Sequence, residues 1–79
     1  MSGLEPQVIA VIAGCLGGPA RSIGINDDLV HDLGCDSLNI VELVEALNAG
    51  FQIVLAPGEI RTWRSVADVI GSVRCAQIG

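Results

Sequence analysis

The sequence predicts an all-α protein with four helices, in which the first connection is long and the third helix is short. Apolar residues recur at helical spacing in three segments, and Gly and Pro clusters separate these segments. The one segment with strand-like composition, Phe51 to Leu55, would find no partner strand in a chain of 79 residues. A chain of this length forms at most one domain, so we expect residues 1–79 to be a single unit.

The first helix is predicted from Pro6 to Leu16. Pro6 suits a first helical turn, and Gly17-Gly18-Pro19 is a strong stop. Apolar residues at the i, i+3, i+4 and i+7 spacing are expected to face the core, and these are Val8, Val11, Ile12 and Cys15.

The connection that follows, Gly17 to Asp36, needs anchors, because a long structureless loop is uncommon in a compact domain. Asn26-Asp27-Asp28 can cap a short helical turn that ends at Leu33-Gly34. We expect the apolar side chains of this connection to reach the core, namely Ile23, Ile25, Leu29, Val30 and Leu33.

The second helix is predicted to start at Asp36 or Ser37, either of which can cap it, and to close at Asn48-Ala49-Gly50. An apolar stripe at helical spacing is expected to face inward, through Leu38, Val41, Val44 and Leu47. The opposite face carries a polar ridge of Asn39, Glu42 and Glu45.

The rest of the chain is predicted as a connector and two helices. Phe51 to Leu55 is expected to be extended and partly buried, and Pro57 to Ile60 suits a short helix with Pro at its first position. Ser65 to Asp68 resembles a capping box at the start of a last helix. Its inward residues are expected to be Val66, Val69, Ile70 and Val73.

Charge and cysteine usage exclude several classes of function. The net charge is -5, and the acids between Ser22 and Ile60 are not interrupted by any Lys or Arg. Such a block repels nucleic acid and anionic membranes and attracts basic protein surfaces. The three cysteines lack metal-ligand spacing, so we expect no metal site and reduced thiols in the cytoplasm. No apolar run approaches the roughly 18 residues that span a bilayer.

The stretch Asp32-Leu33-Gly34-Cys35-Asp36-Ser37-Leu38 carries the strongest signal. A lone Ser before a helix most often only caps it. Here, however, the whole segment from Val30 to Val66 resembles the acyl carrier proteins, whose signature D-L-G-x-D-S-L stands at Asp32 to Leu38. Further positions match at the family's spacing, namely Val41-Glu42-Leu43-Val44, Ala46-Leu47 and Phe51.

The resemblance implies a four-helix bundle of acyl-carrier type with no catalytic activity of its own. It implies that Ser37, between Asp36 and Leu38, is esterified by 4′-phosphopantetheine, which makes the chain a phosphoprotein. A separate phosphopantetheinyl transferase would supply the arm from coenzyme A with Mg²⁺. A helix N-terminus favours the negative charge of the phosphodiester. A hydrolase built on Ser37 and His31 is disfavoured, because a triad also needs an oxyanion hole and a cleft.

The resemblance also implies a partner face and an acyl pocket. Acyl-transferring, condensing or modifying enzymes would bind through basic patches at Val41, Glu42 and Glu45. The pocket would be lined by Leu29, Val30, Leu47, Leu55, Ile60, Trp63 and Val69. Bulky residues at Ile60 and Trp63 imply a short cavity.

Several positions that are commonly acidic in the fatty-acid carriers are uncharged here, including Asn39, Asn48 and Val54. This departure implies service in a specialised fatty-acid or polyketide-type pathway. We expect the chain to be a monomer. Two alternatives stay open at this point. One is a peptidyl or aminoacyl carrier, and the other is an unmodified helical interaction module in which Ser37 only caps.

Overall fold

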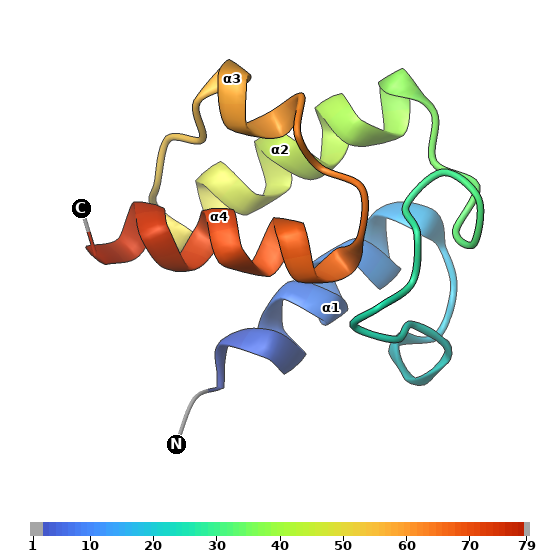
Figure 1. Cartoon of the computed structure of the whole chain (residues 1–79). Helices are drawn as coiled ribbons and strands as arrows, with labels where there is room; N and C mark the ends of the chain where they lie inside the picture. Colours follow the sequence, from blue (N-terminus) through green and yellow to red (C-terminus); the bar gives the residue numbers. More distant parts are fainter. Residues whose placement is uncertain (1–2, 79) are drawn as a thin grey trace.

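The computed structural model describes residues 3–78, which fold into helices joined by loops (Figure 1). The helices are α1 (Leu4–Leu16), a 3-10 turn η1 (Ala20–Ser22), α2 (Ser37–Phe51), α3 (Pro57–Ile60) and α4 (Val66–Ile78). Within this part of the chain, β pairing is limited to one isolated antiparallel bridge between Asp28 and Ser65. The predicted all-α class is confirmed, with the long first connection and the short third helix in place.

The three long helices pack against one another. Each of α1, α2 and α4 contacts the other two, and α3 contacts α4. The connection from α1 to α2 runs along one side of this bundle, on the right in Figure 1, past the start of α4. None of the helices between residues 3 and 78 is long and apolar enough to cross a membrane.

The core lies where these helices meet. In α4 the four residues predicted to face inward are buried: Val66, Val69, Ile70 and Val73. They pack with buried residues of α1, of α2 and of the connections on either side of α2, namely Val8, Ile12, Leu29, Cys35, Leu43, Leu47 and Leu55. Full burial of one such aliphatic side chain contributes about 1.5–3 kcal/mol, so this cluster is the main source of stability.

Helix α1 starts at Leu4, earlier than the predicted Pro6, and ends where predicted. Gly17 adopts the left-handed conformation with φ 75°, which glycine reaches without steric cost. Its N–H donates to the carbonyl of Ala13 at 2.8 Å.

The predicted inward stripe of α2 is wrong at its N-terminal half. Leu38 and Val41 are 64% and 54% exposed, whereas Leu43 and Leu47 are buried. The helix has apolar residues on more than one face, so periodicity alone cannot select the face that packs. Its end is also later than predicted, because Gly50 stays helical and Gln52 takes the left-handed cap position with φ 55°.

The first connection reaches the core at fewer points than predicted. Leu29 is buried, and Ile23 and Leu33 are half-buried, but Ile25 and Val30 are exposed, Val30 at 59%. Leu29 and Val30 are consecutive residues of a turn, which directs Leu29 into the core and leaves Val30 outside. The expectation that Val30 enters the core is therefore wrong.

Backbone hydrogen bonds tie this connection to the start of α4, and we call this contact the clasp. Leu29 N–H donates to Arg64 C=O at 2.8 Å, Val66 N–H to Asp27 C=O at 3.0 Å, and Ala67 N–H to Ile25 C=O at 2.9 Å. The clasp satisfies backbone groups that a loop across the core would otherwise leave unpaired.

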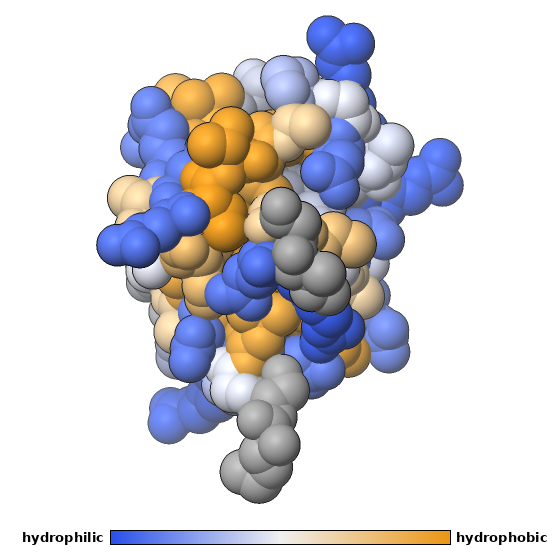
Figure 2. Space-filling view, turned by 90° about the vertical axis from the view of Figure 1, so that its left-hand side faces the viewer, coloured by the Kyte–Doolittle hydropathy of each residue, from blue (hydrophilic) through white to orange (hydrophobic). Residues whose placement is uncertain are grey.

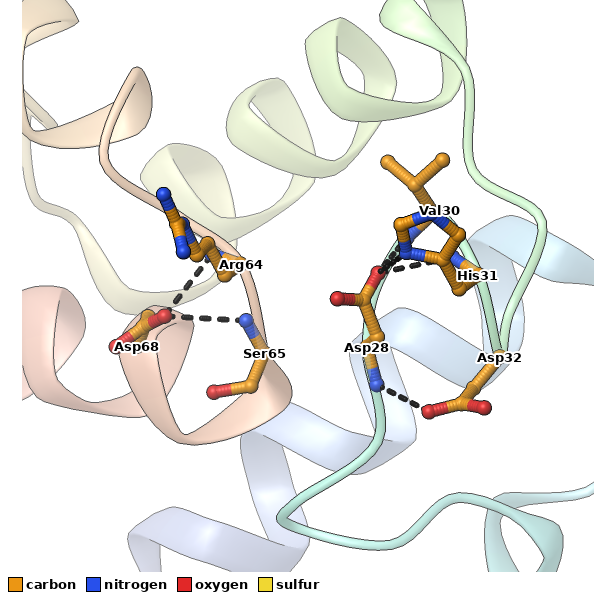
Figure 3. A network of polar contacts seen from close by, with 7 residues as sticks. All are labelled: Asp28, Val30, His31, Asp32, Arg64, Ser65 and Asp68. Carbon is orange, nitrogen blue, oxygen red and sulfur yellow. Dashed lines mark hydrogen bonds and ion pairs between the residues drawn. The ribbon is translucent and has the colours of Figure 1, made fainter.

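Carboxylates brace both sides of the clasp (Figure 3). Asp28 accepts from the N–H groups of Val30 at 2.9 Å and His31 at 2.8 Å, and Asp32 accepts from Asp28 N–H at 2.7 Å. The hydrogen bond from His31 N–H is the main cause that lowers the pKa of Asp28. The short turn predicted at this place is thus capped as expected.

On the other side of the clasp, Asp68 accepts from the N–H groups of Arg64 at 2.9 Å and Ser65 at 3.1 Å. These hydrogen bonds, that from Arg64 first, lower the pKa of Asp68. A capping box has two hydrogen bonds between the N-cap residue and the third helical residue. Of the one predicted at the start of the last helix, the bond from Ser65 N–H to the Asp68 carboxylate is present.

Trp63 fixes the α3–α4 connection to α4. Its indole Nε1 donates to the buried Ser72 hydroxyl at 2.8 Å, and its half-buried ring packs against the core. The hydrogen bond satisfies the one polar atom of a large apolar side chain.

We predict that Asp68→Ala lowers the free energy of unfolding at pH 7 by about 0.5–1.5 kcal/mol, since two backbone donors lose their charged acceptor. A carboxylate with a lowered folded pKa stabilises above its unfolded pKa of about 3.9 and loses this contribution as pH falls through the folded value. The difference between the two proteins should therefore shrink below about pH 4. Urea unfolding across pH 2–7 measures it. Glu45→Ala, which removes an exposed and unbonded carboxylate, is the control, and an equal loss there would contradict the account.

Candidate functional site at the start of α2

The N-terminus of α2 is held by a reciprocal capping box. The Asp36 carboxylate accepts from Asn39 N–H at 2.9 Å, and the Asn39 side chain accepts from Asp36 N–H at 3.1 Å. Of the two predicted caps, Asp36 is therefore the one that caps, and Ser37 is the first helical residue.

Because Asp36 caps the helix, the Ser37 hydroxyl is not used as the cap. The residue is exposed, and within residues 3–78 its Oγ atom makes no hydrogen bond. Just before it, Gly34 takes the left-handed conformation with φ 70°, which turns the chain from the clasp into α2. An accessible hydroxyl on a rigid helix start fits a covalent substituent.

The electrostatic setting suits a phosphodiester at this hydroxyl. The first N–H groups of a helix carry partial positive charge, which favours a phosphate bound there. The adjacent cysteine does not compete as a nucleophile, because burial raises the pKa of the Cys35 thiol and the Asp36 carboxylate raises it further. The residues present therefore fit a phosphopantetheine arm on Ser37.

Exposed apolar and acidic side chains follow Ser37 along α2. Leu38, Val41 and the unexpected Val30 are exposed, and so are Glu42 and Glu45, which form no ion pair within the described chain. We call Leu38, Val41, Glu42 and Glu45 the α2 face. Sequence reasoning placed Val30 inside. Leu29 and Val30 are consecutive residues of a turn, and no periodicity in the sequence tells which of them is buried.

The residues predicted to line an acyl pocket come together in the core, with one exception. Leu29, Leu47, Leu55 and Val69 are buried, and Ile60 and Trp63 pack against them half-buried. Val30 lies on the surface instead. No open pocket is found along residues 3–78, so these side chains pack directly against one another.

His31 does not form a dyad with Ser37. Its imidazole Nδ1 lies 3.2 Å from Asp28 Oδ1, and its side chain is 85% exposed. No cluster of His, Cys, Asp and Glu in the described chain could hold a metal ion. The Ser37 hydroxyl is thus exposed, and the imidazole of His31 is paired with Asp28 instead of with it.

Another apolar surface lies away from this site. Figure 2 shows apolar side chains gathered on the face that includes the C-terminal end of α4 and the connection between α2 and α3. Val54 in that connection is 86% exposed.

Comparison with known proteins places the site in a family. Residues 6–73 match the family described as "Phosphopantetheine attachment site". An acyl carrier protein of Clostridium acetobutylicum is 39% identical over 68 residues, 86% of this chain and 88% of that protein. An acyl carrier protein of Akkermansia muciniphila is 33% identical over 76 residues, 96% of this chain and 95% of that protein.

Solved structures agree. A protein of Mycobacterium tuberculosis assigned as an acyl carrier protein superposes with a TM-score of 0.86 at 33% identity, over 92% of this chain and 97% of that one. A doublet acyl carrier protein from prodigiosin biosynthesis has a TM-score of 0.79 at 24% identity, over 91% of this chain and 35% of that one, and shows the shared fold alone. The chain therefore belongs to the acyl carrier proteins, non-catalytic proteins that share a phosphopantetheine attachment site.

Proposed function

We propose that this chain, as a single carrier domain over residues 1–79, holds acyl intermediates as thioesters on a 4′-phosphopantetheine arm attached to Ser37. The observation that carries the proposal is the division of labour at α2. Asp36 caps the helix, so the exposed Ser37 hydroxyl has no structural role among the described residues. A Ser that only capped would use its side chain on the backbone.

The chain's own residues position and protect the arm. The thiol of the bound arm supplies the thioester chemistry. Ser37 fixes the arm at the first turn of a 15-residue helix, whose N-terminal dipole favours the phosphate. The buried, protonated Cys35 thiol does not attack a thioester nearby. No base on this chain is required, because the transferase catalyses the attachment.

The α2 face supports the partner assignment. Exposed Leu38 and Val41 offer apolar contact beside Ser37, and Glu42 and Glu45 offer charge to basic patches on a transferase and on acyl-handling enzymes. Opposite charges on two proteins raise the rate of association without making dissociation slow. Fast binding and fast dissociation suit a carrier that visits several partners. We place the protein in the cytoplasm as a monomer, in a specialised fatty-acid or polyketide-type pathway. Its three free cysteines support a reducing compartment.

We predict that Ser37→Ala is not modified when the protein is incubated with coenzyme A, Mg²⁺ and a broad-specificity phosphopantetheinyl transferase. Intact mass should show one arm on the wild type and on the control Ser22→Ala, and none on Ser37→Ala. Because the hydroxyl bonds nothing in the described chain, the free energy of unfolding should change by less than about 0.5 kcal/mol. An arm on the Ala variant would move the attachment site, and an unmodified wild type would favour an interaction module.

We predict that reversing the charge of the α2 face slows modification. Glu42→Lys with Glu45→Lys should lower the apparent second-order rate with the same transferase by about tenfold at low salt, and less at high salt, because steering by exposed charges is screened. Glu5→Lys reverses one exposed charge on α1, away from Ser37, and is the control for the nonspecific effect of a charge reversal. If the double variant matched it at every salt concentration, recognition would depend on Leu38 and Val41 instead.

We predict that Trp63 limits the length of acyl chain that the core accepts. Short acyl groups on the holo protein should raise the melting temperature, and the gain should level off with length, since a close-packed core resists expansion. Trp63→Leu should restore a gain for longer chains, although the free variant is less stable. Trp63→Phe, which loses the bond to Ser72 but keeps most of the volume, separates the two effects. A gain that keeps rising with length in the wild type would contradict this role.

A further inference from the structure

Two neighbouring residues at the start of α2 compete for one position, the helix cap. Asp36 and Ser37 are both residue types that cap helices well. In the structure Asp36 is the cap, because its backbone is extended, with φ -108° and ψ -175°, and its carboxylate accepts from Asn39 N–H at 2.9 Å. Ser37 is the first helical residue, and its exposed hydroxyl makes no hydrogen bond within residues 3–78.

A second register is open to this helix, in which it begins one residue later with Ser37 as the cap. We call it the late register. A cap residue places its side-chain oxygen on the backbone N–H of the second or third helical residue. In the late register the third helical residue is Ile40, so Ser37 Oγ would accept from Ile40 N–H. The hydroxyl oxygen would then be held against the backbone instead of standing free for a substituent.

The third helical residue distinguishes the two registers. Counted from Asp36 it is Asn39, whose side chain accepts from Asp36 N–H at 3.1 Å and completes the capping box. Glu or Gln is the usual third residue of such a box, and here the shorter Asn makes the same bond. Counted from Ser37 it is Ile40, a half-buried apolar side chain that has no acceptor. The late register therefore has no reciprocal bond.

The capping box is also what fixes the conformation of Asp36. The clasp holds the chain as far as Cys35, which is buried and donates its N–H to Leu29 C=O at 2.8 Å. The hydrogen bonds of Asp36 all run forward into α2, to Asn39 and to Ile40, whose N–H donates to Asp36 C=O at 3.0 Å. The residue at which α2 starts thus depends on the pair Asp36 and Asn39.

We propose that Asp36 and Asn39 are positioning residues for attachment of the arm, because their capping box holds α2 in the register that keeps the Ser37 hydroxyl free. This inference rests on the proposed attachment at Ser37 and adds how the hydroxyl is kept available. A transferase that acts on the observed register alone meets only a fraction of the carrier, and its apparent dissociation constant rises as that fraction falls. The charge of Asp36 is not needed for this role, since Asn caps a helix as well as Asp.

The first measurement needs no transferase. The backbone ¹³C chemical shifts of Ser37 in the apo protein distinguish a helical residue from an extended cap residue. Asp36→Ala removes the cap, whereas Asp36→Asn removes the charge and keeps the acceptor. Loss of a cap side chain shifts such an equilibrium by about 2- to 30-fold. We expect the shifts of Ser37 to move toward extended values in Asp36→Ala, to a smaller extent in Asn39→Ala, and not in Asp36→Asn.

The second measurement is the kinetics of arm attachment with coenzyme A, Mg²⁺ and the broad-specificity transferase. The apparent KM for the carrier should be at least about twofold higher for Asp36→Ala than for Asp36→Asn, with kcat unchanged, because only the competent fraction falls. Asn39→Ala keeps the net charge, so a higher KM there is not due to weaker steering. The control is Asn48→Ala, which removes a side chain that likewise accepts a backbone N–H at 3.1 Å, that of Leu55, at the other end of α2.

Asn48→Ala should leave the KM and the Ser37 shifts unchanged. If Ser37 stays helical in Asp36→Ala and in Asn39→Ala, the proposal is overturned. It is also overturned if Asp36→Asn raises the KM as much as Asp36→Ala does, since Asp36 would then act through its charge, or if Asn48→Ala has the same effect, since lost stability would explain it. A wild-type protein that takes up no arm would overturn the proposed function instead, and the ¹³C shifts would still decide the register.

Discussion

Leu29 is the residue on which the rest of this structure depends. Its side chain is buried at 2% exposure, its N–H is bonded to Arg64 and its C=O to Cys35. One residue of a long loop thus joins the core, the entry to α4 and the entry to α2. Because both backbone groups are satisfied, the loop can cross the core without the cost of unpaired polar groups. The position of Ser37 follows from this contact and from the Asp36 cap.

The sequence predicted elements better where one physical requirement dominated. Pro57 fixed the start of α3, Gly17 the end of α1, and the apolar spacing of α4 matched its buried face. The prediction from apolar spacing failed in α2, where apolar residues occupy more than one face. Only the packing of α2 against α1 and α4 determines that Leu43 and Leu47 are buried. The choice between Asp36 and Ser37 as cap was equally out of reach, because both residue types cap well.

The misplaced residues are also informative about function. Leu38 and Val41 lie in water on a helix that could have buried them, and Val30 lies in water beside the clasp. Exposed apolar side chains gathered near a modifiable hydroxyl are typical of a surface that partners cover. The charges divide in the same way, with acids on α2 and arginines on the α3–α4 connection.

The measurement that tests the central claim most directly is the location of the arm on the wild-type protein. After incubation with coenzyme A, Mg²⁺ and the transferase, proteolysis and fragment-ion mass spectrometry assign the added group to a residue. The account predicts that every modified molecule carries it on Ser37, the exposed serine at the first position of α2. An arm on Ser22 or Ser65, or spread over several hydroxyls, would contradict the account.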